Sequence, residues 1–243
     1  MKIIRLDYTT LYLLFILLLC GYIRVGLIIF FIVLFHELGH VLVCLLFKYK
    51  IISITIYSFG GITNIEKDIN TSPNKEIILS LAGIFMQIIL IFFIKDTTFI
   101  KYNLSIMLFN LLPIIPLDGS FLLKAILNKF FSFKRAYFLY IIISIISILI
   151  YTVYNYKYSL NNYLIISIFF YRIYKDIKNY KYIYNRFLLE RYLKKYKFKY
   201  ISTRKGSLDI LKLDTYQYFK ENEKIVSEAK KLQERFDKDR NKW

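Results

Sequence analysis

The segment 25–47 is an almost unbroken run of apolar residues, long enough for a helix that crosses a bilayer, which takes about 20 residues. Within it stand the chain's two histidines, His36 and His40, and the acid Glu37. A charged side chain in the middle of a bilayer costs from about 2.5 to more than about 10 kcal/mol. Three polar groups this close together therefore need a partner that offsets the cost.

The spacing of the two histidines indicates what that partner is. Residues four apart lie on one face of a helix, so both imidazoles can bind one metal ion. Glu37 follows His36 directly and can act on a water at the metal. A polar cluster hydrogen-bonded between helices, or a chance match, is the alternative, but neither needs an acid between two histidines at this spacing. The pattern favours a metal site of the His-Glu-x-x-His kind found in zinc peptidases.

The composition excludes an ordinary soluble domain. Hydrophobic residues make up 57% of the 243 residues, and several apolar runs approach or exceed the length needed to cross a bilayer. We expect an all-α polytopic membrane protein with about six transmembrane helices, a short membrane-associated β-hairpin and a cytoplasmic basic tail. The expected spans cover residues 8–23, 25–47, 77–94, 102–117, 137–154 and 163–174.

The positions of the basic residues predict the topology. The formal net charge is +18, and residues 172–243 hold 21 of the 35 Lys and Arg. A basic segment beside a membrane is typical of the cytoplasmic side and its anionic lipids, and makes a nucleic-acid partner the weaker alternative. With a cytoplasmic N-terminus, 31 of the 35 fall on cytoplasmic segments. We expect both termini in the cytoplasm.

Two domains follow from this division. Residues 1–174 would form a six-span domain, and residues 175–243 a basic tail with a linker helix and a small C-terminal region. In the tail, an amphipathic helix is expected over 174–200, a strand over 208–213 and a charged helix over 223–239. The charged helix is polar nearly all round, so it would be solvated or need a partner.

The pattern changes directly after the segment with the histidines. Residues 51–57 are β-branched and partly alternating, Phe59-Gly60-Gly61 interrupts them, and residues 62–65 resume the pattern. This predicts a short β-hairpin, with a plain surface turn as the alternative. A hairpin here can offer a strand edge to an extended peptide, so Phe59, Gly60 and Gly61 are candidate substrate-binding residues.

A second costly feature lies in the fourth expected span. Pro113 and Pro116 cannot both sit in a regular helix, so this span should break at membrane depth, and Asp118 follows the break in apolar surroundings. A simple turn is the alternative, because Pro-x-Asp-Gly is common in turns. The apolar setting favours Asp118 as a third metal ligand, which would leave the fourth position of a zinc ion open, as in catalytic sites.

Together these motifs resemble the site-2 intramembrane metalloproteases, over about residues 1–195. They look most like the sporulation branch of that family, which cleaves the precursor of the late mother-cell sigma factor, sigma-K. The resemblance is carried by His36-Glu37-Leu38-Gly39-His40, Phe59-Gly60-Gly61, Asn110-Leu111-Leu112-Pro113, Pro116-Leu117-Asp118-Gly119 and the segment 186–192.

The resemblance implies one zinc ion on His36, His40 and Asp118, with Glu37 as the base, and Asn110 and Pro116 holding the substrate strand. It also implies regulated intramembrane proteolysis of a protein substrate, membrane-bound inhibitor proteins as partners, and a location in the mother-cell membrane around the forespore.

The chain departs from the family pattern at two places. It has Gly83-Ile84 where the family has Gly-Pro, and the part after Tyr200 is short for the nucleotide-sensing domain of the sporulation branch.

Other functions fit parts of the same pattern. A protease of this type acting on anti-sigma factors or signal-peptide remnants is the nearest alternative. A non-catalytic membrane scaffold is less consistent with the intact Glu37. A metal transporter is less consistent with an acid placed between two histidines.

Overall fold

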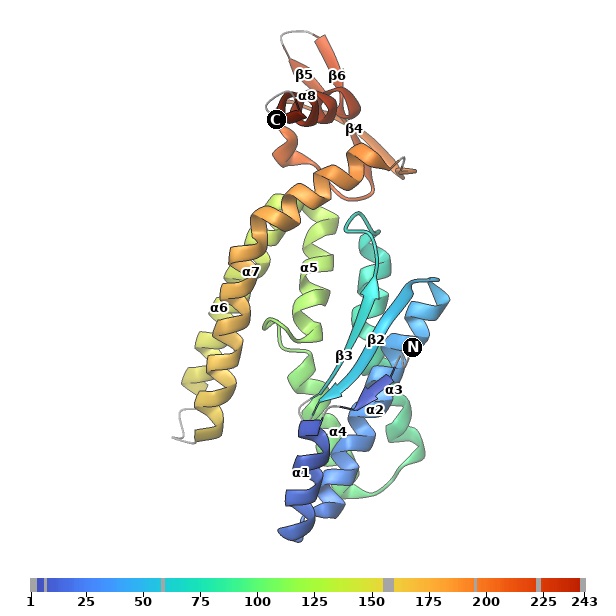
Figure 1. The fold of residues 1–243 in the computed structure, drawn as a ribbon, viewed down its shortest axis with the longest axis vertical. Coiled ribbons are helices and arrows are strands. Elements are labelled where there is room, and N and C mark those ends of the chain that lie inside the picture. Colours follow the sequence, from blue (N-terminus) through green and yellow to red (C-terminus); the bar gives the residue numbers. More distant parts are fainter. Residues whose placement is uncertain are drawn as a thin grey trace. The chain divides into compact units, whose positions relative to one another are not determined.

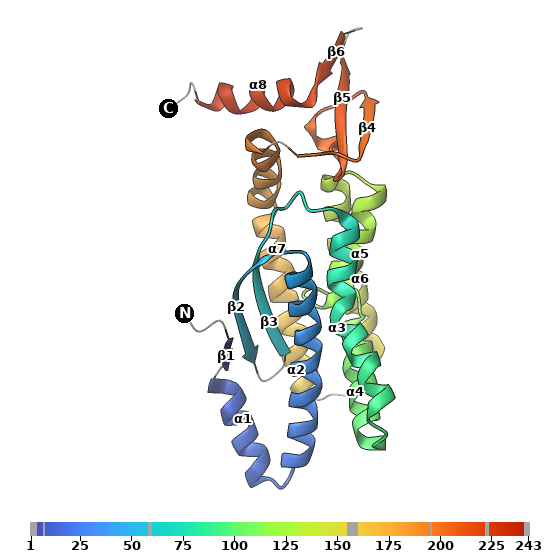
Figure 2. The same ribbon diagram turned by 90° about the vertical axis from the view of Figure 1, so that its right-hand side faces the viewer.

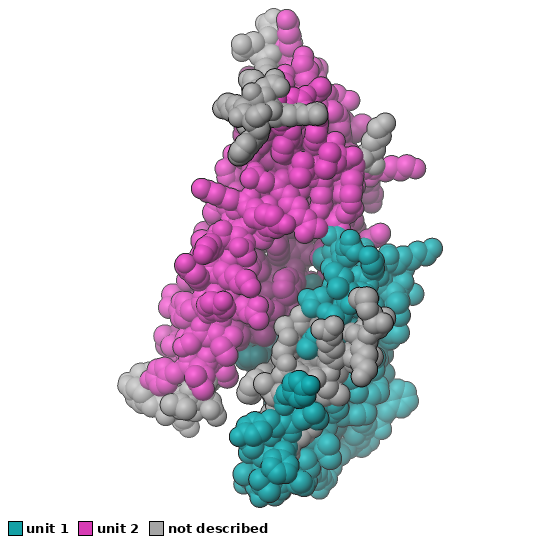
Figure 3. All heavy atoms as spheres, in the orientation of Figure 1, with its two compact units in different colours: residues 1–67, 77–112 teal, residues 68–76, 113–243 magenta. Residues whose placement is uncertain are grey.

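The computed structural model describes residues 4–6, 8–57, 60–154, 160–194, 196–221 and 224–240. The chain divides into two compact units, residues 1–67 with 77–112 and residues 68–76 with 113–243, coloured separately in Figure 3. Each unit has a hydrophobic core of its own.

The first unit combines helices with a small sheet that lies beside α2 (Figures 1 and 2). Its elements are β1 (Ile4–Leu6), α1 (Tyr8–Leu19), α2 (Ile23–Leu46), β2 (Lys50–Tyr57), β3 (Gly60–Glu66), most of α3 (Pro73–Phe93) and α4 (Thr97–Asn110). The turn between α1 and α2 contains Gly21 with φ +77°, a left-handed conformation that glycine adopts without strain.

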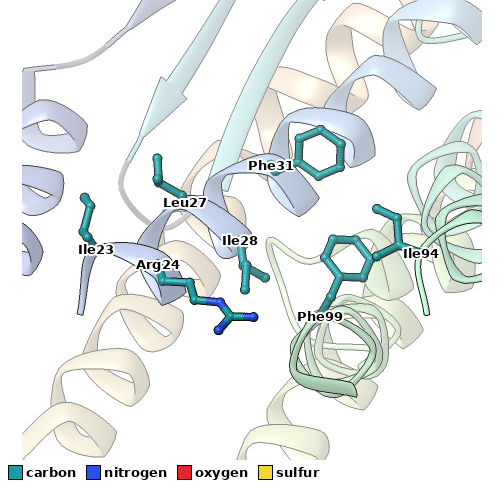
Figure 4. A pocket seen from close by; sticks show the side chains of 7 residues that line it. All are labelled: Ile23, Arg24, Leu27, Ile28, Phe31, Ile94 and Phe99. Carbon is teal, nitrogen blue, oxygen red and sulfur yellow. The ribbon is translucent and has the colours of Figure 1, made fainter. Parts of the chain in front are cut away.

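Apolar side chains from three helices form the core of the first unit. Ile32 of α2, Leu90 of α3 and Phe99 of α4 are all buried in one cluster. The side chain of Asp96 caps α4 by accepting a hydrogen bond from the Phe99 amide at 2.7 Å, and it pairs with Arg24 at 3.3 Å. Beside this ion pair lies an open apolar pocket, whose lining is shown in Figure 4.

The predicted hairpin is confirmed, and the structure adds a third strand. β2 and β3 are antiparallel, with Ile54 opposite Thr63, and run side by side in Figures 1 and 2. β1 pairs parallel to β2, with Ile4 opposite Ile54. The order is β1-β2-β3, so within the described residues the outer edge of β3 carries no further strand.

The described helices support three of the six expected spans. α2, α3 and α6 (Phe133–Tyr154) are long and apolar enough to cross a membrane. The remaining expected spans fall on α1 with 12 residues, on α4 with 14 residues, and on the first part of α7 (Leu160–Leu193), and they stay predictions.

The second unit combines helices with a three-stranded sheet. Besides α6 and α7 it contains α5 (Asp118–Phe130), β4 (Tyr200–Arg204), the 3-10 turn η1 (Leu208–Ile210), β5 (Thr215–Glu221), β6 (Lys224–Ser227) and α8 (Glu228–Arg240). α7 is one helix of 34 residues, so the expected last span and the linker helix of the tail are continuous, and the helix ends before the predicted residue 200.

Two predictions for the tail are wrong. Residues 208–210 form η1 instead of a strand, because the Ser207 side chain caps this turn and Leu211 and Leu213 are buried in the core without strand partners. The charged helix begins only at Glu228, and it is not polar all round, because Leu232 is buried against that core.

Asp209 connects η1 to α6 and α7 of the second unit through hydrogen bonds. Its carboxylate accepts hydrogen bonds from Lys134 at 2.7 Å and from the Tyr184 hydroxyl at 2.8 Å. Burial raises the pKa of Asp209, but these hydrogen bonds outweigh it, so the pKa lies below its ordinary value of 3.8.

This shift predicts a loss of stability in acid. As the pH falls, Asp209 is protonated first in the unfolded chain, because its pKa is higher there than in the folded chain. The contribution of Asp209 to the free energy of unfolding is therefore full above the unfolded pKa of about 3.9 and is lost as the pH falls through the folded pKa. Between pH 6 and pH 3 the melting temperature should therefore fall more for the native chain than for Asp209→Asn. Equal falls in circular dichroism melts would show that the contact contributes nothing.

Candidate metal centre

The middle of α2 carries three polar side chains, and those of His36 and His40 contact residues of α3. His36 is 5% and Glu37 9% exposed, and His40 is half-buried. Their helix approaches α3 closely through Gly39, because a Cβ there would lie 2.4 Å from the Ala82 carbonyl oxygen. Small residues at helix contacts permit such an approach in membranes. The histidine-bearing face of α2 is therefore packed closely against α3.

The two imidazoles converge on one point. Their Nε2 atoms lie 3.2 Å apart. The Nδ1 atom of His40 lies 2.9 Å from the Leu79 carbonyl oxygen. A carbonyl only accepts, so Nδ1 of His40 carries a hydrogen, and in the neutral imidazole the lone pair is then on Nε2.

This geometry fits a zinc ion. Zinc binds imidazole nitrogen at about 2.0–2.1 Å, so two nitrogens at a tetrahedral angle lie about 3.3 Å apart. The observed separation of 3.2 Å matches that spacing. The positions of the two imidazole nitrogens therefore suit a zinc ion.

Gly83 of α3 leaves the space that the His36 ring fills. A Cβ at residue 83 would lie 2.4 Å from Cε1 and 2.5 Å from Nε2 of His36. Cβ atoms essentially never lie this close to a non-bonded heavy atom, and both residues are held within helices, α3 and α2. The glycine of the Gly83-Ile84 pair therefore has a steric role in this chain.

We expect Gly83→Ala to lower the zinc content of the purified chain substantially, because the new methyl group displaces the His36 ring. Metal analysis by mass spectrometry measures this. Leu81→Ala is the control, since Leu81 lies on the same helix and its side chain is 37% exposed. Zinc content at the native level in Gly83→Ala would mean that the ring has room to move.

The predicted break before Asp118 is confirmed. α4 ends at Asn110, and α5 begins at Asp118. Between them Ile114 and Ile115 are 0% and 2% exposed, and the Pro113 carbonyl accepts a hydrogen bond from Ser144 at 3.1 Å. The break is thus packed into the second unit, which holds Asp118 at the start of a helix.

The other candidate residues lie on different elements. Asn110 is the last residue of α4 in the first unit and is half-buried, whereas Pro116 is exposed in the second unit. Gly60 and Gly61 begin β3, and Phe59 lies outside the described residues. His36, Glu37 and His40 are the candidates that one element brings together.

Comparisons with known proteins agree on one family. Residues 24–99, which contain α2, the hairpin and α3, match peptidase family M50. Stage IV sporulation protein FB of Bacillus subtilis is 31% identical over 190 residues, which is 72% of this chain and 66% of that protein.

The chain belongs to peptidase family M50.

Two further proteins are similar to this M50 member. A Synechocystis protein named as a zinc metalloprotease, sll0528, is 35% identical over 116 residues, which is 42% of this chain and 30% of that protein. The solved site-2 protease from Methanocaldococcus jannaschii has a TM-score of 0.46 and 21% identity, covering 81% of this chain and 95% of that chain. The chain spans less than two thirds of the length of both curated relatives.

The family and the three apolar helices make this M50 member a membrane protein.

Sequence reasoning missed two polar residues close to the histidines. Gln87 and Asn103 are 0% exposed and lie on α3 and α4. A polar side chain within an apolar span was the available signal, because such residues are costly unless they have a role.

Proposed function

We propose that this chain is an intramembrane zinc endopeptidase that cleaves a membrane-associated protein. The observation that carries the proposal is the convergence of the His36 and His40 Nε2 atoms at 3.2 Å, on an apolar helix with Glu37 directly after His36. We further propose Asp118 as the third ligand of one zinc ion, on the grounds that it follows the confirmed helix break in an apolar setting.

In this proposal Glu37 is the general base. When bound, the zinc ion supplies Lewis-acid chemistry, lowering the pKa of water to about 7 and polarising the scissile carbonyl. Glu37 takes a proton from the water that attacks the carbonyl carbon and passes it to the leaving amide nitrogen. The peptide C–N bond breaks, the water oxygen stays on the new carboxyl group, and Glu37 ends unprotonated.

Asp118→Asn tests the third ligand. A neutral amide binds zinc less well than a carboxylate and removes a charge beside a dication, so the zinc content of the purified chain should fall well below that of the native chain. Metal analysis decides it, with Asp209→Asn as the control for loss of an acid elsewhere. Full zinc occupancy in Asp118→Asn would show that Asp118 is not a ligand and is only the first residue of α5.

A substrate helix must unfold locally before it is cleaved. Its carbonyls are engaged in i→i−4 hydrogen bonds, so the cleaved segment has to be extended. We propose that it adds as a strand to the outer edge of β3, beginning at Gly60 and Gly61 with Phe59 beside them, and that Asn110 and Pro116 hold it further on. The substrate is placed on β3 and not on β2, because β1 already occupies the outer edge of β2 over residues 54–56.

Crosslinking measures this route. Cysteines placed one at a time along residues 61–65 should crosslink to a cysteine near the cleavage site of the substrate with a period of two, as strand faces alternate. Proline at an edge position should reduce cleavage without loss of zinc, since it removes only a ladder donor. A helical period of three to four would contradict strand addition.

The proposed substrate is the sigma-K precursor of sporulating bacteria. The support is the 31% identity to stage IV sporulation protein FB. This proposal includes six spans in domain 1–174, a basic tail 175–243, cytoplasmic termini, regulation by membrane-bound inhibitor proteins and a place in the mother-cell membrane around the forespore. Anti-sigma factors or signal-peptide remnants are the alternative substrates, and a scaffold role is the non-catalytic alternative.

Co-expression distinguishes these substrates. The chain is produced in a non-sporulating host with a tagged sigma-K precursor or a tagged anti-sigma factor, and the products are followed on immunoblots. A shortened sigma-K precursor supports the proposal, and cleavage of the anti-sigma factor alone supports the alternative. No shortening of either, with the chain present and zinc-loaded, would favour the scaffold.

A further inference from the structure

A buried polar pair lies next to His36 in otherwise apolar surroundings. Gln87 of α3 and Asn103 of α4 are both 0% exposed, in the unit that also holds His36. Burying an amide in an apolar medium without hydrogen bonds is strongly unfavourable. Their hydrogen bonds therefore determine how each side chain is oriented.

The orientation of both amides follows from main-chain carbonyls, which only accept. Asn103 Nδ2 donates to the Gln87 carbonyl oxygen at 2.9 Å, so Asn103 Oδ1 is free to accept from Gln87 Nε2 at 3.2 Å. Gln87 Nε2 also lies 3.5 Å from the Asn103 carbonyl oxygen. Both contacts place the nitrogen of the Gln87 amide toward α4.

The oxygen of the same amide consequently faces His36. Gln87 Oε1 lies 3.0 Å from Nδ1 of His36. An amide oxygen only accepts, so Nδ1 carries a hydrogen, and in the neutral imidazole that binds a metal the lone pair is then on Nε2. This is the tautomer that the Leu79 carbonyl imposes on His40, and the two Nε2 atoms face each other at 3.2 Å.

We propose that Gln87 is a positioning residue that holds His36 in its metal-binding tautomer and ring orientation, and that Asn103 fixes the Gln87 amide. This inference rests on the proposed function, because it takes His36 as a zinc ligand. Partners on the second nitrogen of a ligating histidine orient the ring and raise its basicity, and their removal typically weakens metal binding by about 10–100-fold.

Three variants separate positioning from packing. Gln87→Leu keeps most of the side-chain volume but has no acceptor for His36. Gln87→Glu restores an acceptor oxygen at the same distance along the side chain. Asn103→Leu leaves His36 and Gln87 in place but removes the groups that hold the Gln87 amide in one orientation.

The control variant is Leu90→Ala. Leu90 lies one turn after Gln87 on α3 and is buried against Ile32 and Phe99, so its truncation disturbs the same helix contact without touching His36. Its effect on the melting temperature sets the scale of a packing loss.

The readout is the zinc dissociation constant of the purified full chain, measured by competition with a zinc-binding dye. We expect Gln87→Leu to raise it about 10–100-fold, Asn103→Leu to raise it by less, and Gln87→Glu to restore it to near the native value. Leu90→Ala should lower the melting temperature and leave zinc affinity unchanged.

Two outcomes overturn the inference alone: native affinity in Gln87→Leu, or the same loss in Leu90→Ala as in Gln87→Leu. If Gln87→Leu does not fold, Gln87→Glu is compared with Asn103→Leu instead. Equal zinc dissociation constants in these two variants would also overturn the inference. A native chain that binds no zinc overturns the proposed function, and with it this inference.

Discussion

Glu37→Gln is expected to reduce cleavage by about 10²–10⁴-fold while zinc remains bound, because glutamine keeps the size and a polar contact but cannot accept the proton of the attacking water. The side chain of residue 37 is 9% exposed, so bulk solvent does not easily replace it as the base. The measurement pairs the cleavage rate of the co-produced substrate with the zinc content of the same preparation.

Glu234→Gln is the matched control for this prediction, since it makes the same chemical change at one exposed position of α8. It should leave both cleavage and zinc content at the native level. Near-native cleavage by Glu37→Gln, with zinc bound, would mean that another group is the base and that the mechanism proposed above is wrong.

Arg191→Met is expected to destabilise the tail by about 3–5 kcal/mol, because removal of one partner leaves a buried charge unpaired. Arg191 pairs with Glu228 at 2.7 Å, with side chains 1% and 2% exposed, and it also bonds Asn70 at 2.7 Å. Burial lowers the pKa of Arg191, and Glu228 opposes this. The guanidinium therefore joins α7 to α8 and to the segment before α3.

Hydrogen exchange of the β5 amides in the purified full chain measures this effect, because Glu228 also accepts from the Gln217 amide at 3.0 Å. Protection there should fall steeply in Arg191→Met. Arg186→Met is the control, since its pair with Glu190 has a 45% exposed arginine and such pairs contribute about 0–1 kcal/mol. Unchanged protection in Arg191→Met would show that the tail does not depend on this ion pair.

Much of the first unit, and the helix break at Pro113 and Pro116 in the second unit, could be predicted because their signals are local. The apolar run around His36 and His40 specifies a helix and the face on which both rings lie. Pro113 and Pro116 specify the break, and the alternation in 51–57 specifies the hairpin. Each of these follows from residues close together in the sequence.

The features that were missed depend on partners distant in the sequence. The parallel pairing of β1 with β2 and of β4 with β5 is not encoded within either strand alone. The burial of Leu232 on α8 depends on the core that α7 and β5 form, which no pattern within α8 reveals. Gln87 was missed although it is polar in an apolar run, because its role follows from hydrogen bonds to His36 and Asn103 that only the structure shows.

The proposed function requires that this chain cleave its substrate only when it holds zinc. The most direct test reconstitutes the purified chain with the sigma-K precursor in liposomes, removes zinc with a chelator, restores it, and identifies products by mass spectrometry. We expect about one zinc ion per chain, as two histidines and one carboxylate bind a single ion. Cleavage should stop on chelation and return with zinc. Undiminished cleavage by the zinc-free chain would contradict the account.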